Sequence, residues 1–384
     1  MTMIELDEAT RQRMRRERLR SLPLPFPSAG WEEFNREREA ALDWSPRRRE
    51  NYERYLASSR REARPNYMPV RLDVENVSRC NFRCVMCVVS DWEKGRRAED
   101  MTFDGFRQLI DEQYGLVEVK LNGLGEALMA GDVFFEMIKY ARAQKIWVRM
   151  VTNASLLHLK DNYKKLIDSG VNEIHISIDG ADAEAFSTIR RGAVFDQIVE
   201  NCKMLNAYCR EKGIKRTKAW TVVQKDNCHQ LPEIVDVIGE MGFPGLAFSL
   251  NLHGWGHDEL LEKNRARTVE DTLDPDELHK LVARAEKYGM EIGFWVVGDK
   301  YTTESPEKLC AWPFERSVVT SDMRSVPCCM IGDPEAYEIG RGSGKSLTEL
   351  WMSEEYVNFR QAHLDGDIPH VCRNCYHFEE HAQP

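Results

Sequence analysis

The sequence predicts an α/β protein whose core is an incomplete (β/α)6 barrel, with a helical extension before it and a small domain after it. Three observations support this fold class. Short apolar runs alternate with amphipathic windows of helical period from about residue 70 onwards. Six such strand–helix units follow one another, which favours right-handed crossovers and a parallel sheet. A cysteine-free stretch precedes them and a cysteine-rich stretch follows, so we divide the chain into 1–65, 66–300 and 301–384.

Residues 1–65 form an Arg-rich extension that we predict to be helical. Helical windows at about 6–20 and 31–60 flank a proline-rich breaker at 23–27. The densest basic run extends from Arg11 to Arg20, with Glu17 interleaved. We interpret this run as a solvated helix, and an arm that binds nucleic acid or a membrane surface is the alternative.

The composition describes a soluble globular protein that can bury a sizeable core. The chain has 384 residues, of which 42% are hydrophobic and 30% charged, and it has no apolar run of the length that spans a membrane. Its start lacks the apolar segment of a secretory signal, so we expect a cytoplasmic protein without a membrane partner. The net charge of −10 gives no general attraction to nucleic acid. Eleven cysteines in such a chain indicate metal ligands and free thiols rather than disulfides.

The barrel strands are expected where the apolar runs fall. They are 71–77, 117–122, 147–152, 173–178, 218–223 and 246–251. Helical windows lie between them, near 103–114, 133–144, 157–169, 195–212 and 229–241. In parallel barrels the chemistry lies at the C-terminal ends of the strands. The polar motifs of this chain fall at those ends.

Three cysteines follow the first strand with the spacing C-x3-C-x2-C: Cys80, Cys84 and Cys87. They offer three thiolates to one cubane [4Fe–4S] cluster and leave one iron open to a substrate or cofactor. A zinc site normally needs four ligands, and three free buried thiols are the simplest alternative.

This spacing resembles the signature of the radical S-adenosylmethionine (SAM) enzymes. The resemblance implies that the open iron binds the methionine part of SAM, and that one electron from the cluster splits SAM into methionine and a 5′-deoxyadenosyl radical. The electron would come from an external donor of the flavodoxin or ferredoxin kind. The incomplete (β/α)6 TIM-like barrel is also the core fold of that family.

Further motifs of the family follow in the expected order. Many members carry an aromatic residue before the last cysteine, where this chain has Met86. The run from Gly123 to Ala127 resembles the family's G-G-E-P motif, which places Gly125 and Glu126 near the amino group of SAM. Alone, the same run would be an ordinary strand-to-helix turn.

The ends of the third and fourth strands complete the SAM-binding set that the resemblance implies. Asn153 lies in Thr-Asn-Ala, and Ser177 and Asp179 lie in Ser-Ile-Asp-Gly. Arg190 resembles the arginine that pairs with the carboxylate of SAM, because a guanidinium binds a carboxylate through two parallel bonds. Each tripeptide alone is a common turn signal.

Five cysteines lie in the C-terminal region. The positions Cys310, Cys328, Cys372 and Cys375 offer four thiolates, and Cys329 is spare. With a hairpin predicted around 316–327 and a helix towards residue 364, this region resembles the SPASM/twitch extension of radical SAM enzymes, which holds auxiliary [4Fe–4S] clusters. Five cysteines fit the shorter twitch form with one fully ligated cluster. A structural zinc is the alternative.

The substrate should contact what remains at the strand ends. Candidates are Asp91, Trp92, Glu93, Gln224, Asn227, His253, His257, Trp295, Asp299, Lys300 and Tyr301. Cys228, just after the fifth strand, could donate a hydrogen atom to a substrate radical, as an epimerase requires.

We therefore expect a radical SAM oxidoreductase or epimerase with two clusters. By family analogy the first substrate hypothesis is a small sugar-like or aminocyclitol metabolite of natural-product biosynthesis. The alternative within the class is a peptide-modifying maturase, although 1–65 lacks the strand alternation of a winged-helix peptide-recognition domain. A metal-sensing or RNA-associated binding protein that uses the Arg-rich arm is the alternative from another class.

Overall fold

The computed structural model describes residues 14, 15, 17–59, 61–93, 96, 97, 99–296 and 300–376. A nine-stranded sheet forms the centre, in the order β11-β10-β1-β3-β4-β5-β7-β8-β9, and all neighbouring strands are parallel except β10 and β11. All six predicted strands form close to their expected positions. They are β1 (Arg71–Val74), β3 (Glu118–Leu121), β4 (Trp147–Thr152), β5 (Glu173–Ser177), β7 (Thr217–Val222) and β8 (Gly245–Ser249).

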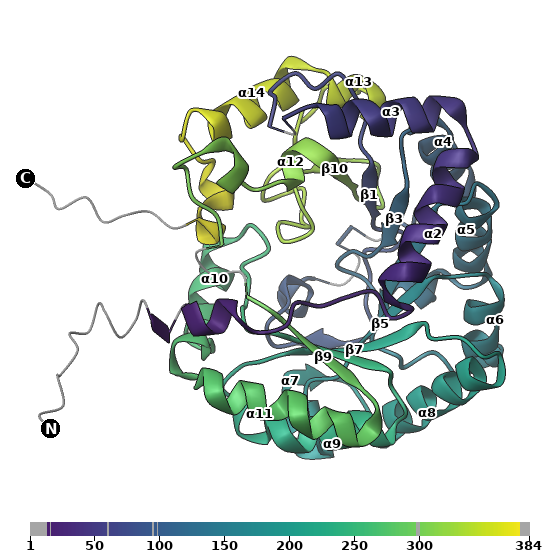
Figure 1. The fold of residues 1–384 in the computed structure, drawn as a ribbon, viewed down its shortest axis with the longest axis vertical. Coiled ribbons are helices and arrows are strands. Elements are labelled where there is room, and N and C mark those ends of the chain that lie inside the picture. The colour runs from purple at the N-terminus through teal and green to yellow at the C-terminus, as the bar shows by residue number, and fades with distance from the viewer. Residues whose placement is uncertain are drawn as a thin grey trace, which may run out of the picture.

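Helices cover the outer face of this sheet (Figure 1). Apolar residues on one side of each strand, such as Val119, Ile174 and Phe248, are fully buried in the main core beneath them. The helices in the predicted windows are α4 (Phe103–Glu112), α5 (Asp132–Ala143), α6 (Asn162–Asp168), α8 (Phe195–Glu211) and α9 (Leu231–Glu240). Further helices are α7 (Ala183–Ile189), α10 (Asp258–Arg265) and α11 (Pro275–Ala285). The fold class is therefore the predicted one.

Three strands extend the sheet beyond the six predicted units. After α11, β9 (Glu291–Trp295) pairs with β8. At the other side β10 (Arg316–Val319) pairs in parallel with β1, and β11 (Ser325–Val326) returns from it as the predicted hairpin. The C-terminal region therefore satisfies the free backbone groups of β1, which would otherwise form an open sheet edge.

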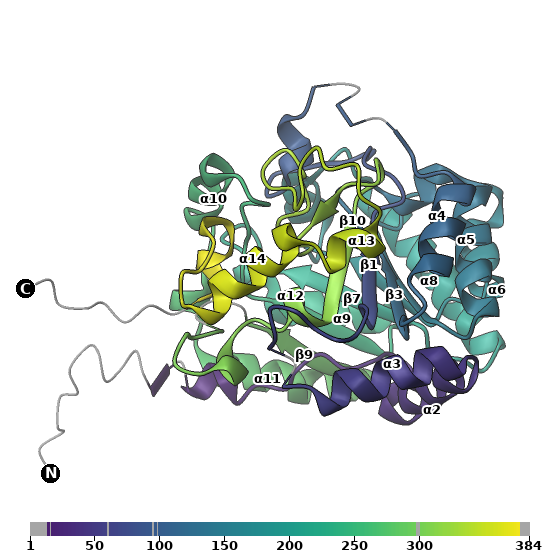
Figure 2. The same ribbon diagram turned by 90° about the horizontal axis from the view of Figure 1, so that it is seen from above.

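The N-terminal extension packs against the barrel and the C-terminal region. Its helices α2 (Gly30–Asp43) and α3 (Pro46–Ala57) lie along one side of the barrel (Figure 2). Their buried residues share a second core with α13 (Leu347–Trp351) and α14 (Glu354–Leu364). The smaller elements of this region are α12 (Trp312–Glu315) and the 3-10 helix η8 (His370–Cys375).

The segment before α2 crosses the N-terminal ends of the strands. The backbone N–H of Phe294 donates to the Pro23 carbonyl, and Lys218 Nζ donates to the Phe26 carbonyl. Most of the predicted helix at 6–20 lies outside the described residues. Within the described part, Arg15 donates to the Leu273 carbonyl at 2.9 Å and Arg18 pairs with Asp276, so these two arginines bind the protein itself.

The inward face of the sheet is charged at this same end. An alternating series of ion pairs links five strands: Arg71–Glu118 at 3.3 Å, Glu118–Arg149 at 3.1 Å, Arg149–Glu173 at 3.0 Å and Glu173–Lys218 at 2.8 Å. Each buried charge has an opposite charge beside it, which makes its burial tolerable.

The C-terminal half of the inward face is more open. Val151, Ser177, Val222 and Trp295 are partly exposed there, whereas the outward neighbours on the same strands are buried. The N-terminal end of the barrel is thus closed by ion pairs and the extension, and the C-terminal end remains accessible. Among the described residues no helix has the length and apolarity needed to cross a membrane.

Candidate active site

The three cysteines of the first motif meet at the C-terminal end of β1. Cys84 lies in the short strand β2 (Arg83–Cys84), which pairs with β6 (Arg190–Arg191) in a two-stranded sheet. Burial raises the pKa of the Cys80 thiol to about 11 and that of Cys87 to about 12, and the Cys84 thiol raises both further. Three thiols that act on one another in this way form one site, and metal binding there must release their protons.

Arg190 holds the cysteine loop against the end of β5. Its guanidinium forms an ion pair with buried Asp179 at 2.6 Å and lies 3.7 Å from the Cys84 sulfur. Asp179 also accepts the backbone N–H of Val222 at 2.7 Å, which fixes the carboxylate to β7. Arg190 Nε is buried and has no hydrogen-bond partner in the described part of the chain. One N–H of the guanidinium is therefore left for a bound group.

Gly125 brings the loop after β3 directly against the backbone that leads to the cysteines. A Cβ at this position would lie 2.1 Å from the Val77 carbonyl oxygen and 2.6 Å from that of Arg79. The neighbouring Glu126 N–H donates to the same Arg79 oxygen at 3.0 Å. Only glycine fits this contact without moving the cysteine loop.

Glu126 ties this loop to the end of β4. Its buried carboxylate accepts the Thr152 hydroxyl at 2.6 Å and the Asn153 N–H at 2.8 Å. The Asn153 side chain in turn donates to Asn81, inside the cysteine motif, at 2.9 Å. Both residues predicted to contact SAM thus also support the cysteine loop.

The remaining predicted cofactor residues lie around the same loop. Ser177 ends β5 on the inward face and is partly exposed. Met86 is buried, and its carbonyl accepts the side-chain N–H groups of Trp255 at 3.2 Å and Asn264 at 3.0 Å. Asn264 could not be recognised from the sequence, because a lone asparagine in a charged helix resembles a surface residue.

Buried polar atoms without partners show that the site suits a polar cofactor. Ser78 Oγ, just before the cysteines, and both side-chain atoms of Gln224, just after β7, have no hydrogen-bond partner among the described residues. Buried polar groups are rarely left unpaired, so these atoms indicate a ligand at the site. The three thiols, the free N–H of Arg190 and these groups fit a cluster with a bound amino-acid-like cofactor. Asn227, by contrast, is satisfied internally by the Asp179 and Val222 carbonyls.

The second cysteine group lies in the C-terminal region. Burial raises the pKa of Cys328 well above its usual range, and the thiols of Cys329, Cys372, Cys375 and Cys310 raise it further. Cys310 is fixed by its N–H, which donates to the Tyr376 hydroxyl at 2.9 Å. The predicted set of four is therefore brought together.

In the described part of the chain no three side chains of Cys, His, Asp or Glu converge closely enough for one metal ion. Zinc and a cubane make different demands on the thiolates, because those of a zinc site bind one atom whereas those of a cubane bind different irons.

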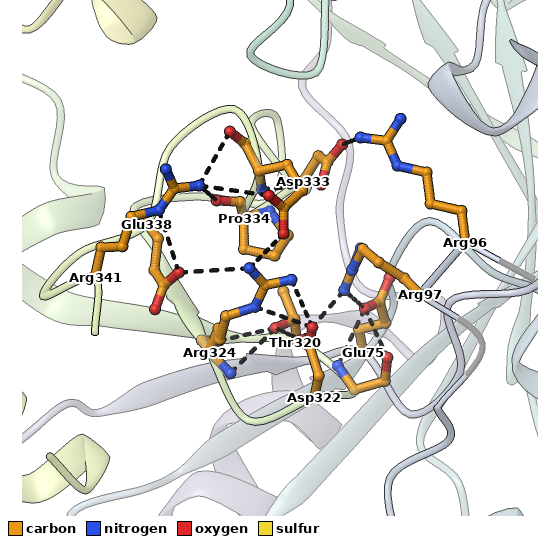
Figure 3. Close-up of polar contacts among 12 residues, drawn as sticks. Glu75, Arg96, Arg97, Thr320, Asp322, Arg324, Asp333, Pro334, Glu338 and Arg341 are labelled. Atoms are coloured by element: carbon orange, nitrogen blue, oxygen red, sulfur yellow. Dashed lines mark hydrogen bonds and ion pairs between the residues drawn. The ribbon is translucent and has the colours of Figure 1, made fainter. Parts of the chain in front are cut away.

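A network of ion pairs links the loop after the first cysteines to the β10–β11 hairpin (Figure 3). Arg97 pairs with buried Glu75 at 2.5 Å and with Asp322 at 3.6 Å. Glu75 also accepts the N–H groups of Leu124 at 2.9 Å and Ser321 at 3.1 Å. This carboxylate joins three segments around the site, and its only sequence signal was an acid directly after an apolar strand.

The predicted substrate residues are dispersed around the mouth. His257 contacts Asp333 at 2.9 Å, and the Lys300 ammonium lies 3.8 Å from the Trp295 ring centre. Burial lowers the pKa of His253 to about 4, so its ring is neutral. A surface cavity of about 140 Å³ beside His253 is lined by none of the cysteines.

Three other predicted substrate residues do not belong to this group. Asp91 is exposed, Trp92 is buried, and Asp299 lies outside the described residues. Cys228 begins the short 3-10 helix η4 (Cys228–Gln230) after β7. Its sulfur contacts the Lys225 carbonyl at 3.7 Å, and its side chain packs against the main core.

Two family models match the chain. The radical SAM superfamily model matches residues 77–238, and the SPASM model, an iron–sulfur cluster-binding domain, matches residues 310–376.

Curated relatives extend over most of the chain. A tungsten-containing aldehyde ferredoxin oxidoreductase cofactor-modifying protein of Pyrococcus furiosus is 26% identical, over 75% of this chain and 82% of that protein. The PqqA peptide cyclase of Bradyrhizobium diazoefficiens is 23% identical, over 83% of this chain and 82% of that protein. The mycofactocin maturase MftC of Mycolicibacterium smegmatis is 29% identical, over 45% and 43%.

Solved structures share the fold. SuiB of Streptococcus suis, bound to S-adenosylmethionine, aligns with a TM-score of 0.56 at 18% identity, covering 76% of this chain and 68% of that chain. The structure of anSMEcpe with bound AdoMet aligns with a TM-score of 0.53 at 16% identity, covering 80% and 88%.

Proposed function

The chain belongs to the radical SAM superfamily and carries a C-terminal SPASM domain, and on this premise we propose that it is a peptide-modifying radical SAM enzyme with two [4Fe–4S] clusters. The observation that carries the proposal is the meeting of three thiols at the accessible end of a parallel barrel whose sheet is completed by the SPASM region. The predicted cofactors, SAM and iron–sulfur clusters, agree with the two family matches.

The residues divide the work between two sites. With a bound cluster and SAM, the first site supplies a 5′-deoxyadenosyl radical that abstracts a hydrogen atom. Cys80, Cys84 and Cys87 would hold the cluster, and the free N–H of Arg190 would bind the SAM carboxylate. The second site would hold the auxiliary cluster through four thiolates, at Cys310, Cys328, Cys372 and Cys375.

The peptide substrate replaces our first hypothesis of a sugar-like or aminocyclitol metabolite. It is supported by the similarity to the PqqA peptide cyclase, which extends over 83% of this chain and therefore beyond the radical SAM domain. None of the relatives reported above is named for a sugar or an aminocyclitol. The relative from Pyrococcus furiosus, named for modifying a cofactor, favours a non-peptide substrate as the second candidate.

The test is SAM cleavage by the anaerobically reconstituted protein. Dithionite and SAM should give 5′-deoxyadenosine, and a defined pool of synthetic peptides should stimulate its formation more than a pool of nucleotides and cofactors. A mass change in one peptide would identify the product. The Cys80→Ala variant should be inactive, and Cys202→Ala, which alters a fully buried thiol in α8, serves as the matched control. Stimulation by the cofactor pool alone would reject the peptide assignment.

An RNA-associated or metal-sensing role makes a different prediction. Such a binding protein would produce no 5′-deoxyadenosine with intact clusters, and its RNA binding would be salt-sensitive and lost on deletion of residues 1–22.

A further inference from the structure

The fifth C-terminal cysteine, Cys329, lies beside charged residues of the central sheet. The charged groups that act on its thiol are Lys120 of β3, Asp73 of β1 and Arg316 of β10, and the thiol lies within hydrogen-bonding reach of Asp73. Cys328, next to it in the chain, lies among Cys310, Cys372 and Cys375, and the Cys329 thiol also acts on Cys328 and Cys375. Cys329 therefore lies at the edge of the auxiliary cysteine group, beside Lys120 and Asp73.

Lys120 is a cation on the inward face of the sheet. Its strand neighbours Val119 and Leu121 are fully buried in the outer core, so its side chain lies on the inward face with that of Glu118. The strand register places it beside Asp73 on β1. Lys120 makes no hydrogen bond or ion pair with another described residue. The charged residues on the inward face at the N-terminal ends of the strands, in contrast, are all paired.

Asp73 presents a second unsatisfied group at the same place. It is 2% exposed, and its Oδ2 has no hydrogen-bond partner among the described residues. Its Oδ1 lies 4.0 Å from the Arg316 guanidinium, which is the long limit of an ion pair. A buried carboxylate oxygen of this kind needs a hydrogen-bond donor, and apart from the nearby Cys329 thiol the described residues supply none.

We propose that Lys120, Asp73 and Cys329 form a substrate subsite that binds a side-chain carboxylate of the peptide, and that Cys329 is not a cluster ligand. The ammonium of Lys120 binds the carboxylate as a point charge. The free oxygen of Asp73 accepts an N–H of the same residue of the peptide. This assignment rests on the proposed function for the identity of the substrate, but the subsite itself can be tested without turnover.

The position of this subsite suits a substrate residue that is held for radical chemistry. Asp73 lies on the strand that leads to Cys80, and Cys329 adjoins a thiol of the auxiliary group. Lys120 and Cys329 are partly exposed, so a small molecule can reach them. The subsite therefore lies between the two cysteine groups on the accessible inward face.

The first test is the selectivity of alkylation at Cys329 in the reconstituted holoenzyme. Iodoacetate is an anion and iodoacetamide is neutral, and peptide mapping by mass spectrometry reports the rate of each at Cys329. Because Lys120 attracts the anion, Lys120→Met should lower the iodoacetate-to-iodoacetamide rate ratio about tenfold. Asp73→Asn should raise the ratio, and Lys120→Arg should preserve it.

Two controls separate a local effect from unfolding. The ratio at Cys228, a partly exposed thiol elsewhere in the barrel, should not change in any of these variants. The surface variant Lys139→Met, whose wild-type ammonium pairs with Glu136 at 2.8 Å, should leave the Cys329 ratio unchanged. A ratio at Cys329 that does not respond to Lys120→Met would overturn the proposal.

Ligand protection and iron content complete the test. N-acetylglutamate amide should slow modification of Cys329 by iodoacetamide, whereas N-acetylglutamine amide and inorganic phosphate should not; protection by phosphate instead would contradict the carboxylate assignment. Cys329→Ala should keep the wild-type iron content, and Cys328→Ala should lose about four iron per chain. Iron loss in Cys329→Ala would make this residue a ligand and reject the proposal. Inactivity of the enzyme towards every peptide, with these results intact, would reject only the proposed function.

Discussion

The ion pair between Arg190 and Asp179 should be the most consequential single contact at the first site. Both side chains are buried and lie 2.6 Å apart. Removing one partner of a buried pair leaves an uncompensated charge and costs about 3–5 kcal/mol. We therefore expect Arg190→Met and Asp179→Asn each to lower the free energy of unfolding by about this amount.

The double variant distinguishes the loss of the ion pair from the loss of side-chain packing. Because Arg190→Met with Asp179→Asn removes both charges, it should cost less than the sum of the single changes, with a coupling energy of about 2–3 kcal/mol. The assay is anaerobic urea unfolding of the four proteins of the cycle, followed by circular dichroism. Single changes that cost less than about 1 kcal/mol and add independently would refute the reasoning.

The same variants test the role of Arg190 towards SAM. A hydrogen bond to a charged group contributes about 1.5–3 kcal/mol, which corresponds to about a 10- to 100-fold change in Kd. Arg190→Met should therefore weaken SAM binding to the reconstituted enzyme by this factor in equilibrium dialysis. An unchanged Kd in a folded, cluster-loaded variant would remove Arg190 from the SAM site.

Three further predictions concern the support of the site. Gly125→Ala should reduce the iron content of the first site, because its Cβ would lie 2.1 Å from the Val77 carbonyl; wild-type iron would show that the loop can move. Burial lowers the pKa of His175 to about 4, so the unfolded chain binds a proton at this residue first as the pH falls. The free energy of unfolding should therefore drop by about 3 kcal/mol between pH 6.5 and about 4. In urea unfolding, His175→Gln should lose less stability over this window. Arg360 is fully buried, lies between the Trp351 and Tyr356 rings and donates to three carbonyls. Arg360→Met should therefore destabilise the protein by about 3–5 kcal/mol. A change in Tm no larger than that of a surface Arg→Met variant would contradict this.

The local pattern of apolar and polar residues was sufficient to predict the six core strands and their helices. Each strand carries apolar residues that the helices cover, such as Ile174 and Ile176 of β5, and this signal lies within a few residues. The pairing of β10 with β1 is different. It joins Arg316 to Arg71 across the length of the barrel domain, and no local period reports such a long-range contact.

The cysteine motifs could be recognised in the sequence because the spacing between the cysteines is itself characteristic of the site. The residues that position them were harder to find. Glu75 and Asn264 act through backbone groups of distant loops, and a single buried acid or amide has no characteristic pattern. Glu126 was expected to lie near the amino group of SAM, and its carboxylate also accepts three hydrogen bonds from the protein. Such contacts depend on tertiary structure, so the sequence could name the residue but not its partners.

The central claim is that Cys80, Cys84 and Cys87 hold the cluster that cleaves SAM, separately from the C-terminal cysteines. The most direct measurement compares iron content and 5′-deoxyadenosine formation in the wild type and in the variant with all three changed to Ala. The wild type should hold about eight iron per chain and cleave SAM, and the variant should hold about four and cleave none. A variant that still produces 5′-deoxyadenosine would contradict the account.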